Sequence, residues 1–451
     1  MRPLIMTMSG TRGVIGENLH PQIALKTAIA FGRFVKTGPV IVGGDTRTSY
    51  DMLNNAVISG LISIGIDVID IGKVPTPTVQ QMIRYHNASG GIVITASHNP
   101  IIWNGLKLMN KTGSFLEPDQ YQEFLTYYQS DSDPLVSWDK LGKIQVDDQA
   151  LKRHADTVLS VLPPDSIKKS GLRVLIDANN GAGAVADPFL MDQLGIEYEI
   201  LNGEPNGHFA HDPEPMQKNL SQIMTYMKNG RFDIGFVQDA DADRLVILDE
   251  TGRFIGEDYS LALSVDYLLS KETDTDKTVV VNLSTSNVIR FVAEKHGAKL
   301  VQTKIGETNV THEIKARKAQ VGGEGNGGVI YPKVGWGRDS LVGIMAALGY
   351  LAESGKKVSE LVAGYPAFVM IREKIEVSSQ DQIQGVLDRV KALFSDLPQN
   401  TIDGIKIDIE NGWIHVRPSN TEPIVRIFIE AESIEKAQAW FLKIQKNVLT
   451  I

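Results

Sequence analysis

Residues 174–180 read Val-Leu-Ile-Asp-Ala-Asn-Asn, an apolar run that breaks into a small polar loop. Residues 40–45 (Val-Ile-Val-Gly-Gly-Asp) and 279–284 (Val-Val-Val-Asn-Leu-Ser) repeat this plan, and a helical pattern follows each of them. Short apolar strands that alternate with helical patterns are typical of α/β domains with largely parallel strands. The sequence therefore predicts three similar α/β domains with mixed, largely parallel sheets.

Each repeat later contains a further predicted strand that ends in a polar or glycine-rich loop. These loops begin at residues 95, 239 and 322. In open α/β sheets, ligands bind beyond the carboxyl ends of the strands. We therefore expect the three loops to face one central cleft.

The C-terminal part of the chain follows a different plan. Strands are predicted near 374–377, 405–409 and 413–416, with a helix through 383–393, and this mixture indicates a smaller α+β domain that also lines the cleft. Glycines and segments rich in Asp or Lys interrupt the pattern between the units. The domains are accordingly expected at residues 1–150, 151–255, 256–370 and 371–451.

The composition excludes several classes of function. The chain has 451 residues and a formal charge of −9, which disfavours nucleic acid or an anionic membrane as a general partner. It contains no cysteine, so disulfides, thiolate catalysis and cysteine metal sites are excluded. No apolar stretch is long enough for a signal-peptide core or a membrane span, and we expect a cytoplasmic protein.

Asp239, Asp241 and Asp243 alternate directly after an apolar run, in a segment that we call the aspartate loop (residues 239–244). Three carboxylates this close repel one another unless a cation lies between them, and a hard divalent ion is the natural occupant. A solvated acidic turn is the plainer alternative. An EF-hand is excluded because Arg244 stands where that loop needs glycine. An aspartyl-phosphate nucleophile stays open on this segment alone.

The serine loop (residues 95–100, Thr-Ala-Ser-His-Asn-Pro) also follows a predicted strand. Ser97 has His98 beside it and Lys107 further along the chain, but no G-x-S-x-G elbow surrounds it, so acyl transfer is disfavoured. A serine that carries a phosphoryl group next to a bound cation would instead be a phosphoryl donor. The alternative is a serine that only hydrogen-bonds its own turn.

Two further segments have the chemistry of anion and hydroxyl binding. The arginine turn (residues 417–423, Arg-Pro-Ser-Asn-Thr-Glu-Pro), with Arg426 after it, combines guanidinium, hydroxyl and amide groups as a phosphate monoester requires. The glycine loop (residues 322–328) would let Glu324 and Asn326 meet the hydroxyls of a polar ligand. Near the N-terminus, Arg12 is a further anion contact. Read singly, each segment is also compatible with an ordinary turn.

These segments, in this order, resemble the α-D-phosphohexomutase superfamily of phosphoglucomutases, phosphomannomutases and phosphoglucosamine mutases. The resemblance covers essentially the whole chain. Its most specific parts are the serine loop with Asn-Gly-Leu-Lys at 104–107, the aspartate loop with its sequence Asp-Ala-Asp-Ala-Asp-Arg, and the arginine turn.

The resemblance implies a phosphoserine at Ser97 and one Mg²⁺ per chain, held by the three aspartates together with the serine's phosphate. This demotes the aspartyl-phosphate alternative, because the carboxylates are then ligands. Lys107, Arg12 and His98 are implied to handle protons and charge at the transfer site. The implied substrate-binding residues are Arg244, Glu324, Asn326, Arg417, Ser419, Asn420, Thr421 and Arg426.

The implied reaction interconverts hexose 6-phosphate and hexose 1-phosphate through a hexose 1,6-bisphosphate, which also primes the enzyme. The partner would be a small phosphosugar, and a homodimer is possible. In the family, the loop corresponding to 323–328 usually reads Gly-Glu-x-Ser-Gly-His, whereas here Asn326 replaces the serine and Gly328 the histidine. No acid or base role of that histidine carries over.

This spelling of the glycine loop, with Gly-Arg-Asp at 337–339, favours phosphoglucosamine mutase. A phosphomannomutase or phosphoglucomutase is the first alternative. A catalytically silent phosphosugar-binding protein is the second.

Overall fold

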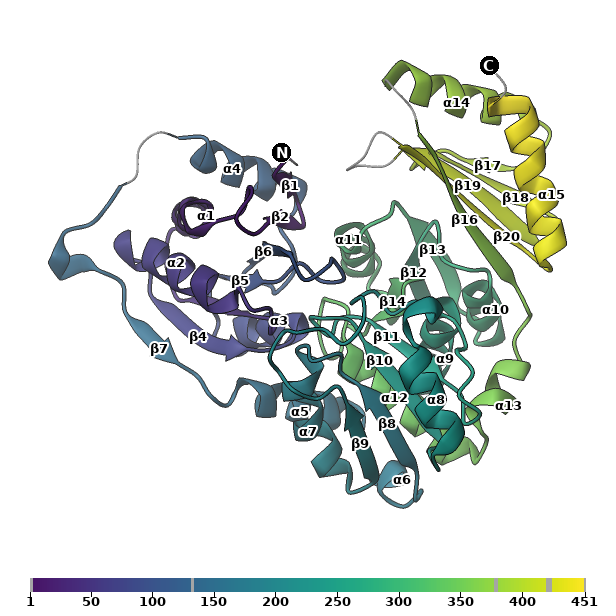
Figure 1. Ribbon diagram of the computed structural model, residues 1–451, viewed down its shortest axis with the longest axis horizontal. Coiled ribbons are helices and arrows are strands. Elements are labelled where there is room, and N and C mark those ends of the chain that lie inside the picture. The colour runs from purple at the N-terminus through teal and green to yellow at the C-terminus, as the bar shows by residue number, and fades with distance from the viewer. Residues whose placement is uncertain (1–2, 131–133, 377–379, 419–423, 450–451) are drawn as a thin grey trace.

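The computed structural model describes residues 3–130, 134–376, 380–418 and 424–449. It contains four sheets in chain order, one for each predicted domain (Figure 1). Three of them combine parallel and antiparallel strands, and the fourth is antiparallel. The predicted fold class is therefore confirmed.

The first sheet has seven strands in the order β1-β2-β6-β5-β3-β4-β7. Its strands β3, β4, β5 and β7 run parallel, and β1, β2 and β6 extend it antiparallel. The helices α1 and α2 pack on each other. The elements are β1 (Ile5–Thr7), β2 (Gly10–Val14), α1 (Pro21–Val35), β3 (Val40–Gly44), α2 (Tyr50–Ser63), β4 (Val68–Lys73), α3 (Thr76–Tyr85), β5 (Gly90–Ile94), β6 (Trp103–Asn110), α4 (Pro118–Tyr128) and β7 (Ile144–Val146).

The second and third sheets have four strands each, in the orders β11-β10-β8-β9 and β13-β12-β14-β15. In both, three parallel strands carry one antiparallel edge strand, β11 or β15. The second unit contains α5 (Ala150–Val161), α6 (Asp165–Lys168), β8 (Arg173–Asp177), α7 (Gly183–Leu194), β9 (Glu197–Leu201), α8 (Ser221–Asn229), β10 (Ile234–Gln238) and β11 (Leu245–Leu248). The third contains α9 (Glu257–Ser270), β12 (Thr278–Asn282), α10 (Val288–Lys295), β13 (Lys299–Thr303), α11 (Glu307–Arg317), β14 (Val321–Glu324), β15 (Gly328–Ile330), α12 (Ser340–Ser354) and α13 (Val358–Ala363).

The second and third units share one hydrophobic core. A single cluster of buried side chains runs from Ala155 in α5 to Tyr365 after α13, and α9 packs against both α12 and β11. Burial of apolar area is the main stabilising contribution to packing, so these two units form one body. The sequence pattern predicted separate domains and did not indicate this shared core.

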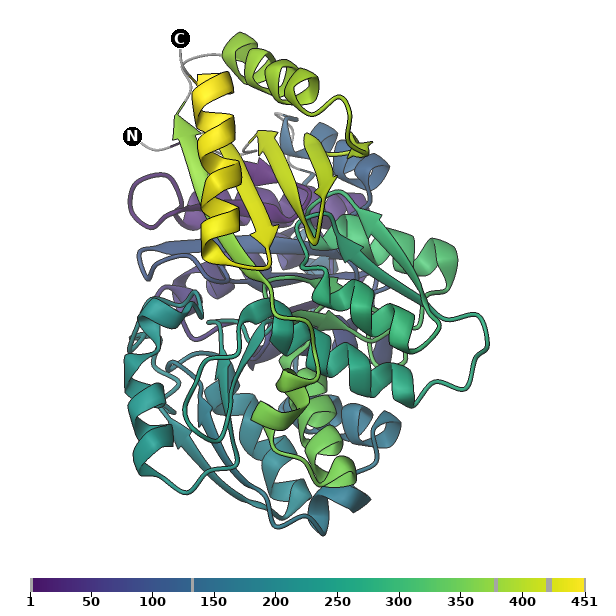
Figure 2. The same ribbon diagram turned by 90° about the vertical axis from the view of Figure 1, so that its right-hand side faces the viewer.

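The fourth sheet is antiparallel, in the order β16-β20-β19-β18-β17. Its strands alternate with a period of two: isoleucines and valines such as Ile427 and Ile429 pack under the helices, while Arg426 and Phe428 lie on the other face, at the cleft. Figures 1 and 2 show both helices on one side of this sheet. The elements are β16 (Val369–Glu376), α14 (Gln380–Leu393), β17 (Gln399–Asn400), β18 (Ile405–Ile409), β19 (Gly412–Pro418), β20 (Ile424–Ala431) and α15 (Ile434–Ile444).

The observed strands agree closely with the predicted ones, with two exceptions: β16 begins at Val369 rather than near 374, and β14 continues to Glu324, although a loop was predicted to begin at residue 322. Three charged residues in succession, Arg372 to Lys374, interrupt the apolar pattern of β16 and hid its first half. Within the described residues, no helix is both long and apolar enough to cross a membrane.

Candidate active site

The serine loop follows β5 and holds Ser97 in a left-handed backbone conformation, with a φ of 52°. Residues other than glycine adopt this conformation mainly where surrounding contacts enforce it. The Ser97 N–H donates to Thr95 Oγ1 at 2.8 Å, and Ser97 Oγ donates to Asp239 Oδ2 at 3.1 Å. The fixed backbone therefore directs the serine hydroxyl at the aspartate loop of another domain.

Arg47, which the sequence analysis did not single out, braces the serine loop. Its fully buried side chain pairs through Nε with Asp45 Oδ2 at 3.1 Å. Its two terminal nitrogens donate, at 2.7 to 2.9 Å, to the backbone carbonyls of Ser97, Asn99, Pro100 and Trp103. The only local signal was a charged pair just after β3, and the sequence does not say where such a guanidinium points.

The aspartate loop joins β10 to β11 and buries all three carboxylates, whose ligand atoms lie within 4.8 Å of one another. Asp239 Oδ1 accepts the N–H groups of Asp243 and Arg244, each at 3.2 Å. Lys107 Nζ donates to Asp241 Oδ2 at 2.6 Å and to Asp243 Oδ2 at 3.2 Å. The loop thus gathers one lysine and three carboxylates in a site closed to solvent.

The crowding of the carboxylates shifts their acidities in opposite directions. Burial, with the charges of Asp243 and Asp241, raises the pKa of Asp239 well above its usual value. Burial also acts to raise the pKa of Asp243, but the surrounding cations, Arg338 first, hold it below its usual value. Asp239 therefore keeps its proton more readily than an ordinary aspartate does unless a further cation binds beside it.

This donor set fits a hard divalent cation. All three side chains offer oxygen, and within the described residues Asp241 Oδ1 and Asp243 Oδ1 are buried without a hydrogen-bond partner. Buried polar atoms in folded proteins are nearly always satisfied, so two unsatisfied carboxylate oxygens side by side indicate a ligand site.

Three cationic or ionisable groups surround Ser97. Lys107, on β6, is 2% exposed; burial lowers its pKa, but the carboxylates of Asp241 and Asp243 outweigh burial and raise it, so the lysine stays charged. Arg244 Nη2 donates to His98 Nδ1 at 2.8 Å. The charge of Arg244 and burial lower the pKa of His98 well below its usual value, which leaves a neutral imidazole.

Arg12, on β2, lies on the same cavity wall. Its Nη1 donates to Asn99 Oδ1 at 3.2 Å, at the far end of the serine loop.

The glycine loop forms the hairpin of β14 and β15: Gly322 to Glu324 belong to β14, Gly328 begins β15, and only residues 325–327 form the turn. Glu324 accepts from Asn282 Nδ2 at 2.9 Å, from the Gly306 N–H at 3.2 Å and from Arg338 Nη1 at 2.8 Å. Asn326 lines the cavity, and its Oδ1 accepts the Gly328 N–H at 3.3 Å. Both predicted side chains therefore face the same space.

Two residues of this region were missed by the sequence analysis. Arg338 is 6% exposed and bonds carboxylates of the aspartate loop, the glycine loop and the start of α11. Glu307, the first residue of α11, lines the cavity, and burial raises its pKa to about 7. Arg338 belongs to the Gly-Arg-Asp run quoted above, but nothing local to either residue indicated a role.

The fourth domain presents a row of cations to the cleft. Lys374 on β16 and Arg417 on β19 are both direct cross-strand partners of Arg426 on β20, so the three side chains share one face of the sheet. Like charges directly opposite each other are destabilising unless a carboxylate or a bound anion offsets them, and Arg417 Nε lies 3.5 Å from Asp403 Oδ1. Ser419, Asn420 and Thr421 of the arginine turn lie outside the described residues.

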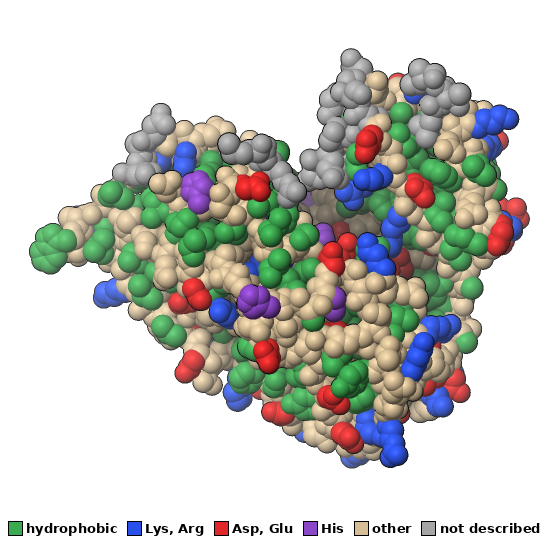
Figure 3. All heavy atoms as spheres, viewed as in Figure 1, with side chains coloured by type: hydrophobic (Ala, Val, Ile, Leu, Met, Phe, Trp, Pro, Cys, Tyr) green, Lys and Arg blue, Asp and Glu red, His purple; other side chains and the backbone are tan. Residues whose placement is uncertain are grey.

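A cavity of about 530 Å³ unites these groups, and it is lined by side chains from all four domains. Figure 3 shows it as a hollow between the N-terminal domain on the left and the fourth domain at the upper right, with charged side chains at its rim. Its lining includes the predicted residues Arg12, His98, Lys107, Arg244, Glu324, Asn326, Arg417 and Arg426. Ser97 and the aspartates lie behind this lining, joined to it by Lys107.

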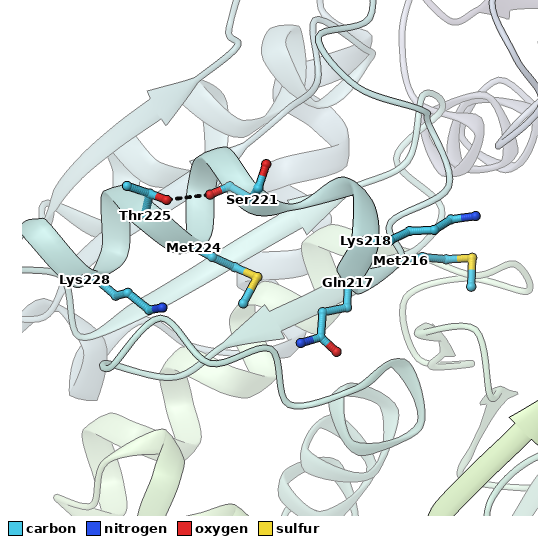
Figure 4. Close-up of a pocket in the computed structure, with 7 residues that line it drawn as sticks. All are labelled: Met216, Gln217, Lys218, Ser221, Met224, Thr225 and Lys228. Atoms are coloured by element: carbon cyan, nitrogen blue, oxygen red, sulfur yellow. Dashed lines mark hydrogen bonds between the residues drawn. The ribbon is translucent and has the colours of Figure 1, made fainter.

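A second, shallower hollow of about 650 Å³ lies along α8 (Figure 4). Its lining has methionines, lysines and hydroxyls but no carboxylate, and Thr225 Oγ1 only bonds the Ser221 carbonyl of its own helix. The reactive groups are gathered in the four-domain cleft instead.

Four domain descriptions of one family match the chain in order. They are the phosphoglucomutase/phosphomannomutase alpha/beta/alpha domains I, II and III, over residues 4–134, 152–252 and 256–368, and the C-terminal domain, over 371–446. The chain belongs to the phosphoglucomutase/phosphomannomutase family. Members of this family are phosphohexomutases, which are isomerase-class phosphotransferases, and the resemblance to the α-D-phosphohexomutase superfamily is confirmed.

Individual relatives cover nearly the whole of this phosphohexomutase. A phosphoglucomutase/phosphomannomutase of Thermococcus kodakarensis is 38% identical over 96% of this chain and 95% of its own length. A probable phosphoglucosamine mutase of Methanopyrus kandleri is 37% identical over 95% and 94%. The crystal structure of a phosphoglucomutase/phosphomannomutase family protein from Burkholderia thailandensis superimposes with a TM-score of 0.85 at 25% identity, covering 99% of this chain and 98% of that one.

Proposed function

We propose that this phosphohexomutase is a cytoplasmic phosphoglucosamine mutase, which interconverts glucosamine 6-phosphate and glucosamine 1-phosphate. The observation that carries the proposal is the contact of Ser97 Oγ with Asp239, behind a cleft whose opposite wall carries Arg417 and Arg426. A nucleophile at one end and a phosphate clamp at the other are what a two-ended phosphosugar requires.

Ser97 carries the phosphoryl group in the proposed reaction. A free hydroxyl of the bound sugar attacks the phosphorus, the bond from phosphorus to Ser97 Oγ breaks, and a hexose 1,6-bisphosphate forms. The bisphosphate then reorients in the cleft, Ser97 Oγ attacks its other phosphorus atom, and the bond from that phosphorus to the sugar oxygen breaks, which releases the product monophosphate. The same bisphosphate, added from outside, phosphorylates Ser97 at the start.

Different residues around Ser97 stabilise the charge of the transferring phosphoryl group and accept or donate protons. Mg²⁺ held by the three aspartates would draw negative charge from the transferring phosphoryl oxygens. Lys107 and Arg12 add fixed positive charge at the same end of the cleft. The proton released by the attacking hydroxyl passes to the carboxylate of Glu307 on the cleft wall, because the one bare ring nitrogen of the neutral His98 already accepts from Arg244. The ammonium group of Lys107 supplies the proton that Ser97 Oγ regains as it leaves the phosphorus.

The other end of the substrate is held by the fourth domain. Arg417 and Arg426 bind the phosphate that does not react, and residues 419–421 complete the clamp. Glu324 and Asn326 contact the sugar hydroxyls between the two ends. Because the clamp meets the phosphate in either orientation of the bisphosphate, one site serves both half-reactions.

The preference for glucosamine is supported by the spelling of the glycine loop and by several relatives, including one of Methanococcus aeolicus named phosphoglucosamine mutase, 35% identical over 95% of this chain. The second candidate, a phosphoglucomutase or phosphomannomutase, is favoured by the name of the Thermococcus kodakarensis relative. The three sugars differ only at C2.

Phosphorus NMR tests the proposal. The protein is supplied with Mg²⁺ and a trace of hexose 1,6-bisphosphate, and glucosamine, glucose and mannose 6-phosphates are offered separately. Fastest conversion of glucosamine 6-phosphate to its 1-phosphate is the expected result. Faster conversion of glucose or mannose phosphate would replace the substrate and keep the mechanism, whereas no interconversion of any of them would overturn the proposal. Chelation of the metal should abolish turnover, and Mg²⁺ should restore it.

A further inference from the structure

The side chain of Arg338 fills the space that a side chain at position 328 would need. A Cβ atom added to Gly328 would lie 2.2 Å from Arg338 Cδ and 2.9 Å from Cγ, well inside contact distance. The backbone at 338 cannot withdraw easily, because it is bridged to Ile330 and the Asp339 N–H donates to the Val329 carbonyl at 2.9 Å. Gly328 is not among the residues with positive φ, so it is required for space rather than for backbone conformation.

The aliphatic part of the Arg338 side chain, its stem, passes over Gly328, and its guanidinium group contacts three carboxylates beyond it. Nη2 donates to Asp243 Oδ2 at 2.8 Å, and Nη1 donates to Glu324 Oε2 at 2.8 Å. Nε lies 3.2 Å from Glu307 Oε2, and the Arg338 N–H donates to Glu307 Oε1 at 3.2 Å. The three carboxylates come from the aspartate loop, the glycine loop and the start of α11.

The planar fork of arginine suits this arrangement, because two carboxylates bound to one rigid guanidinium have a fixed separation and angle. The residue after Arg338 is anchored as well. Asp339 Oδ2 bonds His154 Nε2 of α5 at 2.8 Å, and Asp339 Oδ1 caps α12 by accepting the Leu341 N–H. Arg338 is therefore held by its backbone and can hold others by its side chain.

We propose that Arg338 is a positioning residue that sets the glycine loop and the aspartate loop in one geometry, and that Gly328 is the gap that admits its stem. The proposal rests on the proposed function, in which Glu324 meets the sugar and Asp243 meets the metal. It also explains the departure from the family's loop, since a side chain at 328 and the stem of Arg338 exclude each other.

Four proteins test the spatial pairing: the wild type, Gly328→Ala, Arg338→Ala and the double variant. Arg338→Ala lowers kcat/KM by about 100-fold, as expected for the loss of charge-assisted hydrogen bonds in a buried site. Gly328→Ala lowers it by at least 10-fold, because its methyl group displaces the arginine stem. In the double variant only the Cβ of residue 338, at 3.2 Å, remains beside the methyl group, so activity is close to that of Arg338→Ala. A harmless Gly328→Ala, or losses that multiply in the double variant, would overturn the pairing.

Arg338→Ala could lose activity simply because it fails to fold. Arg338→Lys is the control for this, because lysine keeps the positive charge and most of the aliphatic side chain. We expect a melting temperature close to that of the wild type, with kcat/KM about 10-fold lower and a raised KM, since one ammonium group cannot reach three carboxylates in fixed directions. Wild-type kinetics in Arg338→Lys would reduce the role of Arg338 to its charge and overturn the positioning.

Calorimetry of Mg²⁺ binding, without sugar, gives a readout that is independent of turnover. Arg338→Ala should bind Mg²⁺ about 10-fold less tightly than the wild type, because the aspartate loop loses the guanidinium that fixes Asp243 in place. Unchanged or tighter binding would show that Arg338 does not position the metal loop. If the wild type converts none of the hexose phosphates, the proposed function fails, and this titration still decides whether Arg338 acts on the metal loop.

Discussion

At the scale of single residues, the most exacting position is Ser97, whose left-handed backbone is enforced by Arg47 and Thr95. We expect Ser97→Ala to lower turnover by several orders of magnitude, because no hydroxyl remains to carry the phosphoryl group, while the melting temperature stays near that of the wild type. The wild type incubated with hexose bisphosphate should gain the mass of one phosphoryl group, and the variant should not.

Ser160→Ala is the matched control, since Ser160 lies exposed on α5 and bonds only its own helix. It should keep both turnover and the mass shift. Substantial turnover in Ser97→Ala would remove the phosphoserine from the mechanism.

Asp187 of α7 gives a pH-dependent test of stability. Its carboxyl group is fully buried with one described partner, Gln238 Nε2 at 3.0 Å, and burial raises its pKa to about 7. Because the unfolded value is about 3.9, the folded state holds a proton that the unfolded state releases between these pH values, so folding stability falls as pH rises through this window. The loss, complete above pH 7, is roughly 4 kcal/mol.

Asp187→Asn removes this titration and keeps the shape of the side chain. The melting temperature of the wild type should therefore fall relative to that of the variant by several degrees between pH 5 and 8. Melting temperatures that run parallel over this range would show that Asp187 is ionised in the folded protein.

At the scale of elements, the pairing of β19 with β20 places Arg417 directly opposite Arg426. The mutual repulsion of the two guanidinium groups favours a bound anion, so this pairing predicts an anion-binding site. Arg417→Gln should raise the KM for the hexose phosphate by roughly 10- to 100-fold, because a charge-assisted contact to phosphate is lost. Without ligand, the variant should melt close to the wild type, because the loss of the pair between Arg417 Nε and Asp403 Oδ1, 3.5 Å apart, offsets the relief of the cross-strand repulsion.

Inorganic phosphate provides the second readout for this pair of strands. It should raise the melting temperature of the wild type more than that of Arg417→Gln. Arg389→Gln, an exposed change on α14 of the same domain, should leave both KM and the phosphate effect unchanged. Equal stabilisation of all three proteins by phosphate would place the anion site elsewhere.

Local patterns explain which elements could be predicted from the sequence. A polar run directly after an apolar strand is a local signal, and it located the serine, aspartate and glycine loops. The partners of Arg47 and Arg338 are not local: Arg338 bonds Asp243 across 95 residues of chain, and Arg47 bonds carbonyls 50 to 56 residues away. No periodicity or motif records such contacts, so both residues emerged only from the folded structure.

At the scale of the whole molecule, the cleft is complete only when the fourth domain closes one side of it. Contacts of this domain with the third include Lys406 Nζ to the Leu283 carbonyl at 2.8 Å and the Asn287 N–H to Glu430 Oε1 at 2.9 Å. These bonds run from buried polar groups in the fourth sheet to the loop after β12. The sequence predicted four domains around a cleft, but not that the second and third form one body on which the fourth is mounted.

The connection between that body and the fourth domain passes over Tyr259 of α9. Its hydroxyl donates to the Pro366 carbonyl and accepts the Phe368 N–H, both at 2.8 Å, just before β16 begins. Tyr259→Phe removes both bonds and leaves the ring in place. Each lost bond is worth about 1 kcal/mol, so the segment from 366 to 370 should open more often. Hydrogen exchange read by mass spectrometry should show faster exchange there, and little change in the first domain.

Kinetics then show whether this anchor matters for the reaction. If the placement of the fourth domain limits turnover, kcat/KM of Tyr259→Phe falls severalfold while the Mg²⁺ affinity, which depends on the second domain, is unchanged. Tyr226→Phe, on the outer side of α8, is the matched control for loss of a tyrosine hydroxyl. Faster exchange without a change in kcat/KM would mean that Tyr259 fixes the connection only structurally, and that the contacts of Lys406 and Glu430 alone place the phosphate clamp over the cleft.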